Sequence, residues 1–318
     1  MAIEALLQPV VLFFLLGALA AFARSDLAIP EAVAKGISLY LMMSIGLRGG
    51  GEVAETGFTH DILLAGGAGV ALSFLLPLPA FWLLRTVGRL DRTNAAAVAA
   101  HYGSVSVVTF ATGSEILRHA GMAPAGFMVG VLAVMETPAI ISGLLLARAG
   151  KTDNLAPRGG LLHETFLNGS VILLLGSFVI GMIDGKGGLV TIAPVFDVLF
   201  RGMLCIFLLD MGLIAARRLM DRRALTARTV LLALVLPLIN GTFGVLLGTA
   251  LGLDPGSSAA LGILAGSASY IAVPAVMRLA LPAADPGLYL GMSLAVTFPF
   301  NLTLGIAYYG WLAAGLAA

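Results

Sequence analysis

The chain has 318 residues, of which 59% are hydrophobic and only 11% are charged, and its mean hydropathy is +1.01. Soluble domains carry about 25% charged residues, so this composition excludes a soluble globular protein and indicates an integral membrane protein. The net charge of +1 provides no basic surface for nucleic acid, and the single cysteine, Cys205, can form neither an internal disulfide nor a cysteine cluster for a metal.

Ten apolar segments follow one another along the chain, each close to the roughly 20 residues that a helix needs to cross a bilayer. In chain order they cover residues 5–23, 33–48, 61–84, 94–115, 124–148, 165–183, 195–216, 228–252, 257–278 and 287–312. Turn-forming residues separate them, and Gly49–Gly51 is predicted to end the second. The sequence therefore predicts an all-α polytopic membrane protein with ten transmembrane helices.

The basic residues indicate how the chain is oriented. All but four of the 18 Lys and Arg residues fall in the odd-numbered loops between these segments, and the exceptions are Arg48, Arg118, Lys186 and Arg201. Because basic loops tend to remain in the cytoplasm, we predict that the odd loops are cytoplasmic and that both termini lie outside.

The two halves of the chain resemble one another in the same order as the predicted helices. Lys35–Leu47 resembles Arg201–Leu213, and Gly130–Pro138 resembles Gly291–Pro299, at offsets between 160 and 166 residues. Five helices per half is an odd number, so the second half enters the membrane from the opposite side, as in the inverted repeats of many secondary transporters. The predicted domains are a first repeat at 1–148, a cytoplasmic linker at 149–163 and a second repeat at 164–318.

Small polar residues interrupt the fourth and ninth predicted helices. The run Gly103-Ser104-Val105-Ser106 returns 163 residues later as Gly266-Ser267-Ala268-Ser269. Unwound backbone survives in a membrane only where protein or water satisfies its polar groups. Where each helix restarts, free N–H groups and serine hydroxyls suit a small anion, and the carbonyls where each helix stops suit Na⁺.

These two broken helices are therefore predicted to cross at the midplane and form a binding site. The alternative is that the small residues only let helices pack closely, or that each serine bonds within its own helix.

A few other polar residues lie deep in the predicted spans. Glu136 is the only glutamate at such depth, and an intramembrane carboxylate is a functional-site hypothesis by default. Its counterpart in the second half is Thr297, which Asn301 follows, and we assign these residues to ion coupling. The alternative for Glu136 is a protonated side chain that is hydrogen-bonded inside the bundle. Asn240 is predicted to form a hydrogen bond between helices.

Nothing in the sequence indicates an enzyme. It contains no nucleotide-binding loop, no His-rich metal motif and no Gly-x-Ser-x-Gly elbow, so transport would depend on an ion gradient. Two other functions stay open. One is Na⁺- or H⁺-coupled transport of another small monoanion or monocarboxylate, and the other is a membrane sensor that binds its ligand without translocating it.

Four stretches of the chain resemble one known family. The opening from LLQPVVLFF to GLRGG, the run AHYGSVSVVTF, the segment GVLAVMETPAII and the segment GSASYIAVPAVMRLA are similar to the sodium-dependent bicarbonate transporters of cyanobacteria. The resemblance implies two inverted five-helix repeats, a homotrimer, and core and gate domains that are each built from both repeats. It also implies Na⁺-coupled uptake of bicarbonate across the plasma (inner) membrane of a bacterium.

The resemblance also implies which residues bind the ligands. Gly103–Ser106 and Gly266–Ser269 would bind the substrate, with Tyr270 close by, and we place Thr109 with the sodium and coupling residues. Cyanobacterial members have a longer connection between the repeats and are inhibited by a PII-like trimeric protein. The short connection at Ala149–Leu162 argues against such a partner here and leaves room for a different anion.

Overall fold

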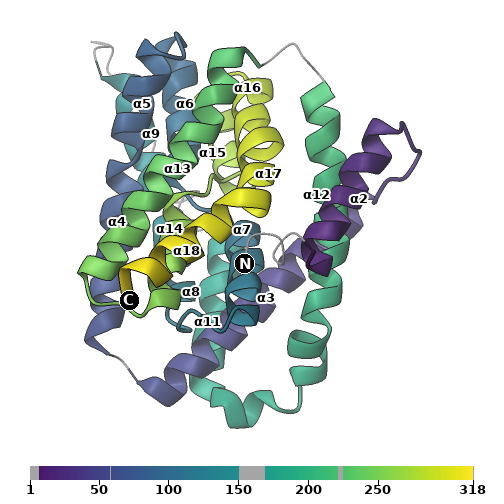
Figure 1. Ribbon diagram of the computed structural model, residues 1–318, viewed down its shortest axis with the longest axis vertical. Helices are drawn as coiled ribbons and strands as arrows, with labels where there is room; N and C mark the ends of the chain where they lie inside the picture. The colour runs from purple at the N-terminus through teal and green to yellow at the C-terminus, as the bar shows by residue number, and fades with distance from the viewer. Residues whose placement is uncertain (1–6, 58, 150–168, 221–224, 318) are drawn as a thin grey trace.

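The computed structural model describes residues 7–57, 59–149, 169–220 and 225–317, and these ranges contain helices but no strand. The predicted linker at 149–163 lies outside them except for Ala149. In the first half the helices are α2 (Pro9–Phe22), α3 (Glu31–Thr56), α4 (His60–Leu75), α5 (Pro77–Thr86), α6 (Arg92–Gly103), α7 (Val107–His119), α8 (Met128–Met135) and α9 (Pro138–Arg148) (Figure 1).

The second half begins with α11 (Gly169–Leu189), which is interrupted at Gly185, and continues through a wide helical turn at Pro194–Val198. It then forms α12 (Phe200–Met220), α13 (Ala227–Ala250), α14 (Pro255–Ala265), α15 (Ala272–Ala280), α16 (Pro286–Leu290), α17 (Phe298–Phe300) and α18 (Ile306–Ala317). Short π-helical segments at Gly291–Thr297 and Asn301–Gly305 join the last three helices into one continuous helical stretch.

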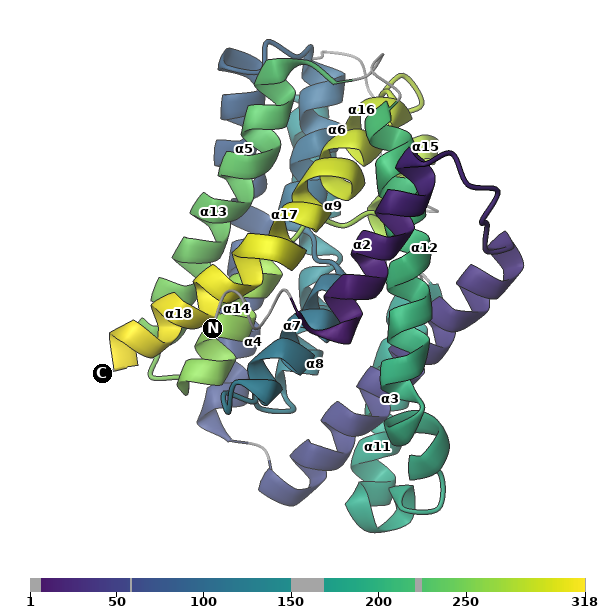
Figure 2. The ribbon, with the colours of Figure 1, turned by 45° about the vertical axis from the view of Figure 1, so that its right-hand side comes forward.

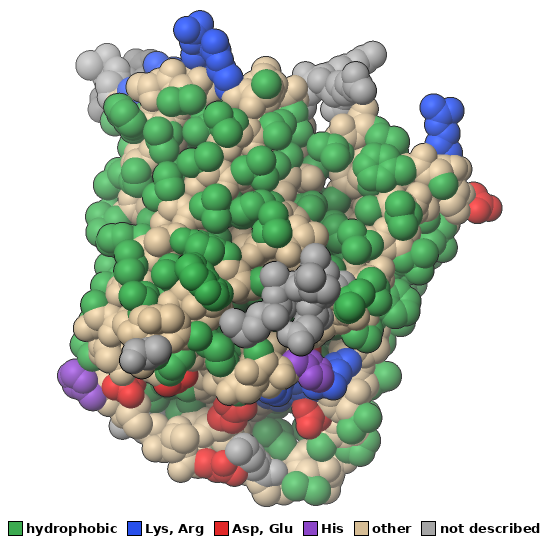
Figure 3. Space-filling view, viewed as in Figure 1, with side chains coloured by type: hydrophobic (Ala, Val, Ile, Leu, Met, Phe, Trp, Pro, Cys, Tyr) green, Lys and Arg blue, Asp and Glu red, His purple; other side chains and the backbone are tan. Residues whose placement is uncertain are grey.

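Six helical stretches of the described chain are long and apolar enough to cross a membrane, which supports a polytopic membrane protein. They are His60–Thr86, Arg92–His119, Met128–Arg148, Pro194–Met220, Ala227–Ala250 and Pro286–Ala317. In Figure 3, apolar side chains cover the middle of the molecule, and charged side chains gather at its two ends. Exposed apolar residues such as Leu63, Trp82 and Phe243 are costly in water but suit a lipid environment.

The helices form two groups (Figures 1 and 2). In the first, α2 packs along α12 and α3 packs along α11. The second contains α4–α9 and α13–α18, with α6 and α14 at its centre and almost wholly buried. A seam between the groups runs past α7 and α8, which contact α3 or its neighbours.

The prediction that Gly49–Gly51 ends the second helix is wrong, because α3 continues through these glycines to Thr56. The reason is the close approach of α11. A Cβ on Gly50 would lie 1.9 Å from the carbonyl oxygen of Phe178, and a Cβ on Gly181 would lie 2.3 Å from that of Leu47. The glycines therefore serve helix packing, which in membranes relies on small residues at the interface.

We expect Gly50→Ala to destabilise the protein, because its added methyl group would meet the backbone of α11 and overpacking costs about 1–3 kcal/mol. Gly67→Ala in α4 is the matched control, since no atom lies within 4 Å of the Cβ that it adds. The measurement is the thermal unfolding midpoint in detergent. A midpoint of Gly50→Ala at or above that of Gly67→Ala would contradict this account of the α3–α11 contact.

Candidate functional site

The structure has a helix break at each Gly-Ser run. The first helix stops at Gly103 and restarts at Val107, and the second stops at Ala265 and restarts at Ala272. The two pairs run in opposite directions, with α6 beside α15 and α7 beside α14 (Figure 2). Residues 103–106 and 266–270 are all buried.

Hydrogen bonds join the two breaks directly. The backbone N–H of Ser269 donates to the carbonyl of His101 over 2.9 Å. The N–H of Ser106 donates to Oγ of Ser267 over 2.9 Å, and that hydroxyl donates to the carbonyl of Leu264 over 2.8 Å. Buried backbone groups that leave a helix need other partners, and here each break supplies partners for the other.

The same side-chain chemistry begins the helices of both pairs. Asp91 caps α6 by accepting from the N–H of Asn94 over 3.0 Å, and Asp254 caps α14 by accepting from Ser257 over 2.9 Å. After the breaks, Oγ of Ser106 accepts from the N–H of Thr109 over 3.2 Å. Capping oxygens of this kind fix the point at which a helix begins.

The second serine of each Gly-Ser run accepts a hydrogen bond from a backbone N–H group further along the chain. Oγ of Ser269 accepts from the N–H of Val273 over 3.4 Å, as Oγ of Ser106 does from Thr109. Ser106 is the N-cap of α7, whereas the N-cap position of α15 is Ile271, which has no side-chain cap. The structure thus brings the two Gly-Ser runs, with their serine hydroxyls, together in a buried position.

Glu136 lies at a third interruption, between α8 and α9. Its backbone carbonyl accepts from Oγ of Ser104 over 3.2 Å, so it borders the first break. The hydroxyl of Ser73 supports the interruption by donating to Met135 O over 2.5 Å and accepting from the N–H of Ala139 over 3.1 Å. The carboxylate of Glu136 is buried, and its Oε2 has no hydrogen-bond partner among the residues that the structure describes.

Thr297 and Asn301 contact the ends of the two helices that stop at the breaks. The hydroxyl of Thr297 donates to Ala233 O over 2.6 Å and pairs with that of Tyr102, next to Gly103, over 2.7 Å. The amide of Asn301 donates to the carbonyl of Gly266 over 2.8 Å. Both residues thereby hold the carbonyl ends of α6 and α14 in place.

Glycine is required at both breaks because other elements approach closely. A Cβ on Gly103 would lie 2.4 Å from Cγ of Pro77, and a Cβ on Gly266 would lie 2.5 Å from the hydroxyl of Tyr309. A Cβ on Gly266 would also lie 2.9 Å from the carbonyl oxygen of Pro237. The two halves therefore place a proline against the glycine of each break.

The remaining site residues that the sequence predicted are buried at or beside the breaks. Val105, Ala268 and Thr109 are all at most 3% exposed. The ring of Tyr270 meets that of Phe298 edge to face at 5.3 Å, and its buried hydroxyl lies beside Ser106 without a well-formed hydrogen bond.

Several residues at the site were not among those predicted. Ser73, Tyr102 and Tyr309 all support the breaks, and the hydroxyl of Tyr309 donates to Pro237 O over 2.8 Å. Only the position of Tyr102 next to Gly103 gave a sequence signal. The predicted inter-helix hydrogen bond of Asn240 is confirmed, because its amide donates to the carbonyl of Tyr102 over 3.2 Å.

His101 also borders the first break. Its Nδ1 bonds to the carbonyl of Ala97 over 2.7 Å, and its ring stacks on Tyr289 at 4.6 Å. Within the described ranges, no group of three or more His, Cys, Asp or Glu side chains could hold a metal ion.

Comparison with known proteins agrees with the resemblance of the four sequence stretches. A comparison with curated protein sequences gave no match. The family model of the Na⁺-dependent bicarbonate transporter superfamily matches residues 9–314, which is almost the whole chain. The chain therefore belongs to the Na⁺-dependent bicarbonate transporter superfamily.

Proposed function

We propose that the protein is a secondary transporter that takes up bicarbonate together with Na⁺ across the plasma membrane. One observation carries the proposal: two helix breaks from opposite halves of the chain lie against each other in a buried position, joined through Ser269–His101 and Ser106–Ser267. Broken helices that meet inside the membrane are how many secondary transporters build their substrate sites.

The anion would bind where α7 and α15 begin. The first N–H groups of a helix lack intrahelical partners and carry a partial positive charge, which favours a compact monoanion. The hydroxyls of Ser106 and Ser269 add donors, and a neighbouring oxygen can accept from the hydroxyl group of bicarbonate. Gly103 and Gly266 allow the backbone itself to approach the ligand.

The cation would bind beside the anion, at the carbonyl ends of α6 and α14, where Thr109, Glu136, Thr297 and Asn301 contribute oxygen atoms. Carbonyl and carboxylate oxygens at unwound helix ends suit Na⁺ in transporters. Because the two ligands have opposite charges, each is expected to tighten the binding of the other, and this coupling is reciprocal.

Movement of the α4–α9 and α13–α18 group against the α2, α3, α11 and α12 group would expose the site to each side in turn. The paired contacts of Pro77 with Gly103 and Pro237 with Gly266 support an inverted repeat behind this movement. The assembly that we propose is a homotrimer with both termini outside, and the short connection between the halves argues against a PII-like partner.

The decisive experiment measures uptake of radiolabelled bicarbonate into proteoliposomes with and without an inward Na⁺ gradient. We expect uptake that requires Na⁺ and competition from other small monoanions in proportion to their affinity. A folded protein that carries no bicarbonate under any gradient would overturn the proposal. Saturable binding without flux would instead favour a sensor, and flux of a small monocarboxylate alone would change the substrate.

Proton coupling is the second candidate, and the unpartnered Oε2 of the buried Glu136 favours it. If Na⁺ is the coupling ion, as we propose, Glu136→Gln should raise the Na⁺ concentration for half-maximal uptake about tenfold, equivalent to about 1.4 kcal/mol. The reason is that the amide keeps an oxygen atom but loses the negative charge. Glu31→Gln, at the exposed start of α3, is the matched control. Wild-type uptake that persists without Na⁺ and collapses in Glu136→Gln would assign the coupling to protons.

A further inference from the structure

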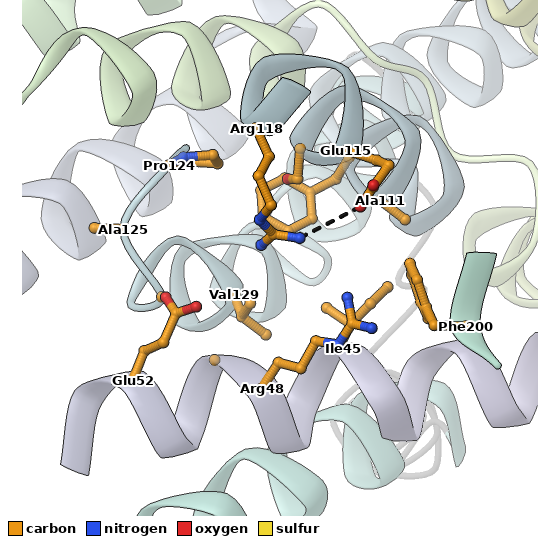
Figure 4. Close-up of a pocket in the computed structure, with 14 residues that line it drawn as sticks. Ile45, Arg48, Glu52, Ala111, Glu115, Arg118, Pro124, Ala125, Val129 and Phe200 are labelled. Atoms are coloured by element: carbon orange, nitrogen blue, oxygen red, sulfur yellow. Dashed lines mark hydrogen bonds and ion pairs between the residues drawn. The ribbon is translucent and has the colours of Figure 1, made fainter. Parts of the chain in front are cut away.

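A pocket lies in the seam between the two helix groups, at the end of the molecule opposite its basic loops. Helices α3 and α7 form its walls, with α8 and α12 at its sides (Figure 4). Arg48, Arg118 and Arg201, three of the four basic residues outside the odd loops, gather at this pocket and the wider hollow that adjoins it. The orientation predicted from the basic loops places this end outside the cell.

Arg48 is held in the pocket by contacts with Asp197 and Phe200. Its guanidinium lies 4.4 Å from the ring centre of Phe200, and its Nη2 donates to the carbonyl of Asp197 over 2.6 Å and pairs with Oδ1 of the same residue. Its Nε is buried and has no partner among the described residues. Buried donors are normally hydrogen-bonded, so one that faces a pocket without a partner points to a ligand.

Glu115 occupies the opposite wall and is itself an anion surrounded by bases. Its carboxylate is 3% exposed and lies 3.3 Å from Arg118 and 3.5 Å from His119, and it also pairs with Arg201. The single carboxylate of Glu115 therefore lies within ion-pair distance of two arginines and a histidine. This neighbourhood already stabilises the buried negative charge of Glu115.

Ser114 provides a second donor that has no hydrogen-bond partner in the described part of the chain. Its Oγ is buried and lines the pocket, whereas a serine inside a helix ordinarily bonds back to a carbonyl of the preceding turn. Glu52 also lines the pocket, but Figure 4 shows it on the side of Pro124 and Ala125, away from the guanidinium of Arg48.

The pocket adjoins a narrower hollow on the side of the helix breaks. It shares Ile45 and Ala111 with a narrower hollow that reaches Val107 and Val108, directly after Ser106. Toward the surface it shares Arg48 and Glu115, among others, with the wider hollow under the α11–α12 connection. Three separate hollows thus lie next to one another along α3 and α7, between the surface and the start of α7.

We propose that this pocket is a second anion-binding site, a vestibule in which Arg48 Nε and Ser114 Oγ bind a small oxyanion on its way to the breaks. Arg118 adds charge, and Glu115 holds the arginines in position. The choice of ligand rests on the proposed function, so bicarbonate is the oxyanion expected. The linings of the pocket and of the adjoining hollow contain equal numbers of arginines and carboxylates, so the donors of Arg48 and Ser114, rather than a net positive charge, select the anion.

The test uses Ser114→Cys in a Cys205→Ala background, purified in nanodiscs so that both faces are accessible. We expect an anionic methanethiosulfonate to react about tenfold faster than a cationic one of similar size. Bicarbonate should slow the reaction saturably, whereas chloride at equal ionic strength should not, because screening of charge alone does not occupy the site. Thr59→Cys, exposed near the same end, is the control and should show neither effect.

Adding Arg48→Gln should remove both the anionic preference and the protection by bicarbonate, and in liposomes it should raise KM while leaving the maximal rate near that of the wild type. Equal reaction rates with both reagents, or protection that survives Arg48→Gln, would overturn the vestibule. Protection in nanodiscs without wild-type flux in liposomes would keep the vestibule and overturn the proposed transport instead.

Discussion

Replacing Ser106 and Ser269 together by alanine is expected to abolish Na⁺-dependent uptake of bicarbonate while leaving the protein folded. Ser106 caps α7 by accepting from the N–H of Thr109, and the hydroxyl of Ser269, three residues before α15, accepts from the N–H of Val273. A hydrogen bond to a charged group is worth about 1.5–3 kcal/mol, so each lost hydroxyl should lower kcat/KM at least about tenfold. The measurement is initial uptake in proteoliposomes at several bicarbonate concentrations.

Loss of a cap costs about 1 kcal/mol of stability, so thermal unfolding in detergent must accompany the uptake measurement. Ser44→Ala is the matched control, because that buried hydroxyl only donates to Tyr40 O within α3. Ser106→Thr should retain more activity than Ser106→Ala, since threonine keeps the hydroxyl group. Normal uptake by the double alanine variant would show that the serines are only structural.

Gly103→Ala is expected to stop transport through geometry alone. The new Cβ would lie 2.4 Å from Cγ of Pro77 and 2.9 Å from the carbonyl oxygen of Ser73, so the break has to shift against a rigid ring and a backbone atom. Overpacking of this kind costs about 1–3 kcal/mol, which moves the break without unfolding the helix bundle. We expect at least a tenfold loss of uptake, since 1.4 kcal/mol corresponds to a factor of ten.

Gly176→Ala, in α11, is the control because nothing lies within 4 Å of its added Cβ, and it should transport normally. Combining Gly103→Ala with Pro77→Ala removes the closest atoms and should restore part of the uptake. Wild-type activity in Gly103→Ala alone would mean that the position of the break is not critical. Failure of the double variant together with a normal unfolding midpoint would place the constraint on Ser73 instead.

The sequence alone determined the features that depend on local chemistry. A low content of charged residues with long apolar segments is decisive for a membrane protein, because lipid tolerates few charges at any position. The breaks at Gly103 and Gly266 were also predictable, since glycine and serine weaken a helix and Asp91 and Asp254 start one at matched distances upstream. These signals reside within a few residues of each other.

Only the tertiary structure decided how glycine and proline act at other positions. Gly49–Gly51 reads as a break, yet α3 continues through it because α11 packs against its glycines. The tripeptide Leu-Pro-Leu separates α4 from α5 at Pro77 but lies inside α13 at Pro237. Local sequence permits both outcomes, and the neighbouring helix selects one.

The partners of the breaks were also beyond the sequence. The hydroxyls of Ser73 and Tyr309 reach their carbonyls from helices that are distant along the chain, and Arg48 in the first half of the chain pairs with Asp197 in the second. A polar side chain in an apolar segment shows that some partner must exist, because an unpaired buried group costs about 1–3 kcal/mol. Which partner it finds depends on how whole helices pack, and no short stretch of sequence contains that information.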